Sequence, residues 1–172
     1  MEAIRTQGLT QTFGDNTAVN NLTLTLKEGE VFGLVGPDGA GKTTVMRLLA
    51  GLMPPTAGDA WVYGCHTVKD AEQLRHHISY MPQRFGLYLD LTVQENIDFY
   101  ADLYNVSRQT RKEKIPELLA FSNMTEFRDR QARNLSGGMK QKLALACALV
   151  HTPRVLLLDE PTNGVDPLSR RD

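Results

Sequence analysis

The 172-residue sequence predicts an α/β fold with a β-containing core and an inserted helical subdomain. Three observations predict it. Residues 31–35 form a short apolar run that leads into a glycine-rich segment, and residues 155–158 form a second apolar run that ends at Asp159. Between these runs, residues 91–150 read as nearly continuous helix. We therefore expect a core lobe at 1–83 and 153–172, with the helical subdomain at about 84–152.

An antiparallel β layer is expected at the N-terminus. Residues 4–10 and 17–26 show alternating apolar side chains, which is typical of half-buried strands. Another short strand, at residues 60–63, follows the turn at 54–58. This strand contains the only tryptophan of the chain, Trp61, which we interpret as a packing residue.

The inserted block predicts three helices. They lie at residues 93–104, at 110–121, and from Ser136 to residue 150. Pro116 interrupts the middle one, so that helix is expected to begin or bend there.

The glycine-rich segment that follows the first apolar run has the pattern G-x-x-x-x-G-K-[ST], and residues 45–50 after it read as helix. Strand, loop and helix form the context in which this pattern binds nucleotide phosphates. Its glycines let the backbone turn tightly and aim N–H groups inward. Lys42 supplies a point charge, and Thr43 supplies a hydroxyl for Mg²⁺. The residues expected to bind the phosphates are Gly36, Pro37, Asp38, Gly39, Ala40, Gly41, Lys42, Thr43 and Thr44.

Two adjacent carboxylates, Asp159 and Glu160, stand at the end of the second apolar run. This is the place where a P-loop enzyme holds Mg²⁺, and two neighbouring carboxylates imply two roles. At the frayed end of a strand both can approach the phosphates, Asp159 on the metal side and Glu160 near an attacking water. A surface acidic pair that closes a strand is the structural alternative. Together the loop and the carboxylates predict a P-loop NTPase (RecA-like) core.

Upstream of that strand, residues 135–142 read LSGGMKQK. Ser136 is a good N-cap, and the two glycines after it leave backbone N–H groups bare at the start of a helix, which makes a second anion site. This segment resembles the signature motif of ATP-binding cassette (ABC) ATPases. The resemblance implies that Ser136, Gly137 and Gly138 bind the ATP held by the P-loop of a second subunit, in a head-to-tail dimer.

The resemblance implies roles for three further residues. Gln83 is similar to the Q-loop glutamine, which contacts Mg²⁺ and takes part in catalysis, and Asp166 is similar to the D-loop aspartate at the dimer interface. Phe13 lies where the family places an aromatic ring against adenine, which suits stacking of two flat π-surfaces. For Phe13, packing into the core remains an equal alternative.

The chain also departs from the family pattern. Met139 stands where many relatives have Gln, and Asp38 where Asn or Ser is common. The family's switch histidine is expected on a strand beyond Asp159, and we therefore expect a domain truncated before it, without its C-terminal part. No histidine of this chain has the required position: they are His66, His76, His77 and His151.

Composition excludes several functions. With 41% apolar and 23% charged residues and a net charge of −1, the chain resembles an ordinary globular domain and has no basic footprint for nucleic acid. No apolar run approaches the roughly 18 residues of a membrane span. Cys65 and Cys147 lack paired spacing, so we expect two free thiols in a reducing cytosol.

The expected function is that of an ATP-binding and ATP-hydrolysing subunit that powers a membrane exporter, with ATP and Mg²⁺ as cofactors. Residues 86–93 and 163–167 resemble the drug-exporter type of ABC-2 ATPases. Implied partners are a transmembrane permease and a second ATP-binding subunit, at the cytoplasmic face of the membrane. Only 94 positions separate Lys42 from Ser136, without sustained heptads, so chromosome-maintenance ATPases with long coiled coils do not fit. The alternatives are a nucleotide-binding module without hydrolysis and, more distantly, a metabolic P-loop kinase.

Overall fold

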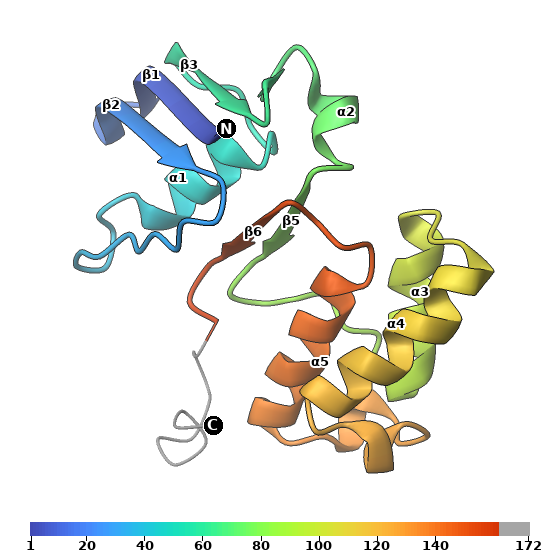
Figure 1. The fold of residues 1–172 in the computed structure, drawn as a ribbon. Coiled ribbons are helices and arrows are strands. Elements are labelled where there is room, and N and C mark those ends of the chain that lie inside the picture. The colour runs from blue at the N-terminus through green and yellow to red at the C-terminus, as the bar shows by residue number, and fades with distance from the viewer. Residues whose placement is uncertain (162–172) are drawn as a thin grey trace. The chain divides into compact units, whose positions relative to one another are not determined.

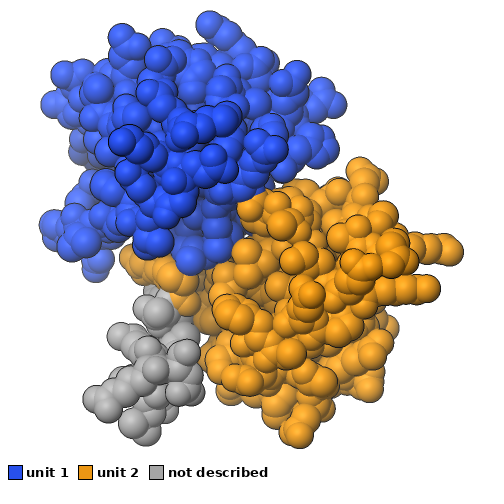
Figure 2. All heavy atoms as spheres, viewed as in Figure 1, with its two compact units in different colours: residues 1–80, 154–159 blue, residues 81–153, 160–172 orange. Residues whose placement is uncertain are grey.

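The computed structural model describes residues 1–161, which divide between two compact units (Figure 2). Unit 1 contains Met1–Tyr80 and Arg154–Asp159, and unit 2 contains Met81–Pro153 and, of the described residues that follow, Glu160 and Pro161. The chain therefore leaves unit 1 after Tyr80, builds the helical unit 2, returns to unit 1 for a single short strand, and leaves it again after Asp159. The elements are labelled in Figure 1.

Unit 1 is built on an antiparallel sheet with the strand order β2-β1-β3-β4. Strands β1 (Glu2–Phe13) and β2 (Asn16–Lys27) form a hairpin in which Glu2 pairs with Lys27 and Phe13 with Asn16. Strands β3 (Ala57–Val62) and β4 (Cys65–His66) complete it on the other side of β1. The N-terminal antiparallel β layer predicted from the alternating apolar residues is confirmed.

One face of this sheet is covered by helix α1 (Lys42–Leu49) (Figure 1). The helix buries Val45, Leu48 and Leu49 in a cluster that also contains Leu9 of β1 and Val62 of β3. Helix α2 (Ala71–Leu74) is a short turn that contributes Leu74 to the same cluster. Burial of these side chains fixes the start of α1 against the β layer.

The strand predicted before Asp159 is confirmed as β6 (Val155–Leu158), which pairs with β5 (Ile78–Met81). The backbone N–H groups of Arg154 and Val155 both donate to the carbonyl of His77 and bring the two segments together. This pairing places the end of β6 beside the end of β5.

The strand predicted at residues 31–35 is wrong. This apolar segment forms no strand, and Val31 and Val35 are 103% and 99% exposed. A strand needs a hydrogen-bonded neighbour to satisfy its backbone groups, and neither sheet of the described residues includes this segment. A groove of about 410 Å³ lies in unit 1 instead, lined by residues of this segment, by α1 and by β6.

Unit 2 contains α3 (Val93–Leu103), α4 (Arg108–Phe121) and α5 (Gly137–Leu149), with 3₁₀ turns at Thr125–Phe127 and Ala132–Asn134. The helices pack around a core made of Val93, Ile97, Ala101, Ile115, Leu118, Leu119, Leu143, Cys147 and their neighbours. The expectation that the middle helix begins or bends at Pro116 is wrong for its start, because α4 begins at Arg108 and continues past Pro116. Cys65 and Cys147 are free thiols, as predicted, and the structure shows that both are buried. Within residues 1–161, no helix is long and apolar enough to cross a membrane.

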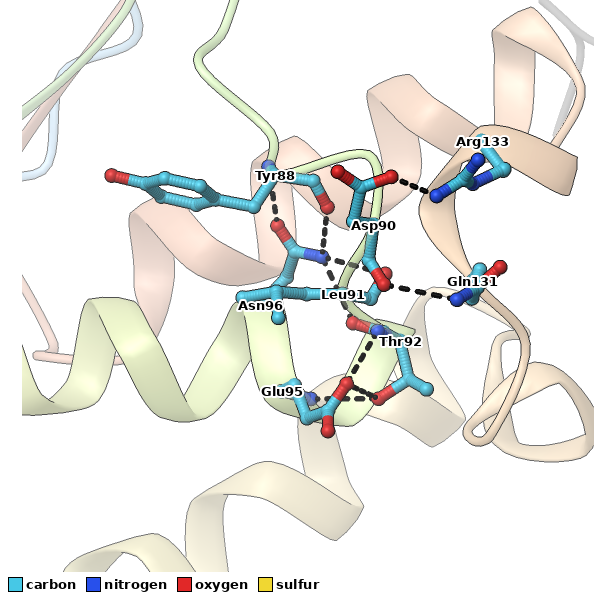
Figure 3. A network of polar contacts seen from close by, with 8 residues as sticks. All are labelled: Tyr88, Asp90, Leu91, Thr92, Glu95, Asn96, Gln131 and Arg133. Atoms are coloured by element: carbon cyan, nitrogen blue, oxygen red, sulfur yellow. Dashed lines mark hydrogen bonds and ion pairs between the residues drawn. The ribbon is translucent and has the colours of Figure 1, made fainter.

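The entry into α3 is fixed by a network of polar contacts (Figure 3). Asn96 is fully buried; its Oδ1 accepts from the Tyr88 N–H at 2.9 Å, and its Nδ2 lies within 3.3 Å of the carbonyls of Tyr88, Leu91 and Thr92. Thr92 and Glu95 form a reciprocal capping box, and these hydrogen bonds lower the pKa of Glu95. Because one amide contacts four backbone groups, it ties the segment between Tyr88 and Thr92 to the start of α3.

We expect Asn96→Asp to lower the free energy of unfolding by roughly 3 kcal/mol, because a carboxylate cannot donate to the three carbonyls that Asn96 contacts. Denaturant unfolding of both proteins measures this difference. Asn105→Asp is the matched control, since Asn105 is exposed and its positive φ is one that Asp tolerates. A loss no greater than that of the control would show that the network is not stabilising.

Candidate functional site

The glycine-rich loop reaches α1 through two residues with left-handed backbone, Gly39 at φ 79° and Gly41 at φ 86°. A Cβ on Gly41 would lie 2.1 Å from the carbonyl oxygen of Ala18 on β2, so only glycine fits at this point. No side chain in the described chain caps the start of α1, and its first turn contains no acidic residue. Its first N–H groups and the positive end of the helix dipole are therefore available to an anion.

Lys42 lies within its own loop. Its Nζ donates to the carbonyl oxygens of Gly36 and Pro37, each at 2.8 Å. An ammonium group has three protons, so these two contacts orient the cation and leave one donor for a bound anion. The loop thus presents backbone N–H groups and one positive charge together.

The loop and β6 meet through one hydrogen bond. The Thr43 hydroxyl donates to Asp159 Oδ1 at 3.0 Å, across 116 positions of sequence. Asp159 is only 4% exposed, yet no cation contacts it among the described residues. Burying a carboxylate without an opposite charge is costly, so a carboxylate that only neutral hydroxyls contact is a suitable site for a bound cation.

Tyr80 is a site residue that the sequence did not identify. Its hydroxyl donates to the second oxygen of the same carboxylate, Asp159 Oδ2, at 3.1 Å. Burial raises the pKa of the Tyr80 phenol; the Arg47 guanidinium opposes this rise and the Asp159 carboxylate adds to it. The phenol therefore stays protonated at neutral pH and acts as a donor. No motif marks this tyrosine, whose position follows only from the pairing of β5 with β6.

These residues fit a magnesium ion that is bound together with a nucleotide. Thr43 and Asp159 offer the hard oxygen ligands that Mg²⁺ prefers. Residues 1–161 contain no group of three or more His, Cys, Asp or Glu side chains arranged for a metal. Since Mg²⁺ usually takes one or two protein ligands and completes its shell with phosphate and water, this sparse set suits it.

Several other predicted site residues lie in unit 2. Ser136 caps α5, with its hydroxyl accepting from the Met139 N–H at 3.3 Å, so Gly137 and Gly138 begin the helix as expected. Gln83 is exposed on the segment after β5. Glu160 follows Asp159 with a left-handed backbone, φ 52°, which is uncommon outside glycine and asparagine and turns the chain at this point.

Two further predicted residues lie elsewhere. Phe13 ends β1 and is 50% exposed, so its ring is not part of the core. It therefore remains a candidate to stack against a flat ligand. Asp166 lies outside the described residues.

The motifs and the fold agree with a known family. A family model described as ABC transporter matches residues 19–163. The chain belongs to the ABC transporter family. The resemblance that rested on the P-loop, the signature segment and the Asp159–Glu160 pair is thereby confirmed.

Among ABC proteins, a probable multidrug ABC transporter ATP-binding protein, YbhF of Escherichia coli (strain K12), is 56% identical over 158 residues, which are 92% of this chain and 27% of that protein. The Nod factor export ATP-binding protein I of Rhizobium meliloti (strain 1021) is 39% identical over 98% of this chain and 50% of its own length. The linearmycin resistance ATP-binding protein LnrL of Bacillus subtilis (strain 168) is 35% identical over 97% of the chain and 54% of its own length. The chain thus spans about half or less of each of these relatives.

Two solved ABC structures share the fold. An ATP-binding subunit of an ABC transporter superposes with a TM-score of 0.87 at 28% identity and covers 98% of this chain and 70% of its own. A dimeric ATP-binding cassette in a post-hydrolysis state, bound to ADP and Pi, gives 0.84 at 28% identity, with 98% and 78% covered. The predicted P-loop NTPase core with an antiparallel β layer and helical subdomain is confirmed.

Proposed function

We propose that this chain is the ATP-binding and ATP-hydrolysing part of an ABC exporter. The observation that supports this most directly is the 3.0 Å hydrogen bond from Thr43 to Asp159, made beside an uncapped helix start and the Lys42 ammonium. It joins a phosphate-binding loop to a metal-binding carboxylate, which is the pairing that phosphoryl transfer requires.

The loop binds the triphosphate of ATP. Backbone N–H groups of residues 36 and 38–44 and the Lys42 Nζ neutralise negative charge on the β- and γ-phosphates, including the charge that develops on the leaving group as the bond breaks. Thr43, Asp159 and Gln83 would hold Mg²⁺, which would neutralise negative charge on the phosphates. Phe13 stacks against the adenine ring.

Glu160 acts next to Asp159 as the group that orients and deprotonates water. A carboxylate adjacent to the metal-binding residue reaches the far side of the γ-phosphate, where an in-line nucleophile must stand. The capped helix start at Ser136, Gly137 and Gly138 closes the site of a second subunit in a head-to-tail dimer, because N–H groups at a helix start bind phosphate. Asp166 takes the interface position that its motif implies.

The transport role comes from the relatives. The similar proteins from Escherichia coli and Rhizobium meliloti are named for multidrug transport and Nod factor export. We infer that this chain likewise drives export, through a transmembrane permease that holds it at the cytoplasmic face of the membrane.

Calorimetry with a non-hydrolysable ATP analogue, followed by a steady-state phosphate-release assay on the full-length protein, tests this function. We expect binding and turnover that depend on Mg²⁺. The affinities for GTP and ATP should differ less than the affinities for ATP and AMP, because most of the proposed contacts are to phosphates. Absence of analogue binding would refute the proposal. Binding without phosphate release would leave a nucleotide-binding module in place of an ATPase.

A further inference from the structure

The Asp159 carboxylate is held from two different elements of unit 1. Its Oδ1 accepts from Thr43 on α1 at 3.0 Å, and its Oδ2 accepts from Tyr80 on β5 at 3.1 Å. The Thr43 contact belongs to the phosphate-binding loop already assigned. The Tyr80 contact belongs to no motif and has no part in the proposed reaction.

Two donors, one on each carboxylate oxygen, fix the orientation of the carboxylate group, which a single donor does not. The torsion of an aspartate carboxyl group about its last bond is broad, so a single hydrogen bond leaves the group free to turn. A second donor on the other oxygen, supplied by a different element, fixes the plane of the carboxylate. Each oxygen has two lone pairs, so one on each remains for the metal or a metal-bound water.

The chemistry of the second donor also matters. A Lys or Arg in place of Tyr80 would fix the carboxylate but cancel its charge, and the attraction for a divalent cation would fall. A neutral phenol fixes the group without that loss. Its ring is half-buried against the core of unit 1, which supports the hydroxyl that donates to Asp159.

We propose that Tyr80 is a positioning residue for the metal site, which holds the Asp159 carboxylate in the plane that binds Mg²⁺ with the nucleotide. The inference rests on the proposed ATP-binding function. Partners that orient metal ligands in this way commonly change metal affinity by about 10- to 100-fold when they are removed. Tyr80 is therefore expected to act on the metal-dependent part of nucleotide affinity alone.

Tyr80→Phe tests this, because it keeps the ring and removes only the donor. Binding of a non-hydrolysable ATP analogue is measured by calorimetry twice, in excess Mg²⁺ and in excess EDTA, and the ratio of the two affinities is compared with that of the unaltered protein. We expect this ratio to fall about tenfold, with the affinity in EDTA unchanged. Titration with Mn²⁺, followed by its electron paramagnetic resonance signal, should show the same weakening.

Tyr104→Phe is the matched control. Tyr104 stacks on His151 in unit 2, and its hydroxyl makes no hydrogen bond within residues 1–161, so neither affinity should change. An unchanged ratio in Tyr80→Phe would overturn the inference, as would equal losses of affinity in Mg²⁺ and in EDTA, which indicate a merely structural role. Failure of the unaltered protein to bind the analogue at all would instead refute the proposed function.

Discussion

Glu160→Gln is expected to leave ATP binding intact and to lower the rate of ATP hydrolysis by a factor of roughly 10² or more. The amide keeps the shape of the side chain and its ability to orient water, but it cannot accept the proton. Glu160 directly follows the buried Asp159, and its left-handed backbone turns the chain away from the direction of β6. Because Gln preserves the shape of the side chain, this substitution removes proton transfer but keeps the ability to orient water.

Steady-state phosphate release from the full-length protein measures turnover, and calorimetry with ATP measures binding. Glu117→Gln is the matched control, since Glu117 is an exposed partner of Lys114 on α4 and should affect neither quantity. Turnover equal to that of the control would remove Glu160 from the role of general base and leave the binding site as assigned.

Lys42→Ala is expected to weaken ATP binding by about 10- to 100-fold, since a hydrogen bond to a charged group contributes about 1.5–3 kcal/mol. The substitution removes the only cation that the structure places within the loop, together with its contacts to the carbonyls of Gly36 and Pro37. The loop then loses both a charge for the phosphates and the support that keeps it open.

Filter binding or calorimetry provides the affinity. Lys69→Ala is suited as the control, because Lys69 is exposed and only its backbone N–H forms a hydrogen bond. Equal affinities of the Lys42→Ala variant and the unaltered protein would contradict the phosphate-binding role of the loop. A loss of ATP affinity in both variants would indicate that the overall charge of the protein, and not a specific contact of Lys42, determines the affinity.

The sequence predicted most of the site because its key residues belong to local patterns. The G-x-x-x-x-G-K-[ST] segment and the serine before two glycines each specify a helix start, and both are found at α1 and α5. Asp159 could be expected near Thr43 once the loop and the second apolar run were identified, and the two are hydrogen-bonded. Strands β1 and β2 follow from simple alternation.

What the sequence did not predict depends on partners that a pattern does not specify. Residues 31–35 have the composition of a buried strand, but an apolar run does not say whether another strand lies beside it. Tyr80 acquires its role only because β5 and β6 pair and bring its hydroxyl to Asp159. Asn96 reads as an ordinary polar position in a helix, and its four backbone contacts depend on how the preceding segment folds back.

The apolar segment at residues 31–35 has a consequence for the self-association of this polypeptide in solution. Val31 and Val35 are fully exposed to water, and their segment lines an apolar groove without belonging to a sheet of the described residues. Exposed backbone groups of this kind can pair with a strand from another chain. At raised protein concentration, copies of this chain should associate through residues 31–35. Purification at low concentration, or with a mild detergent, should accordingly recover more dispersed material.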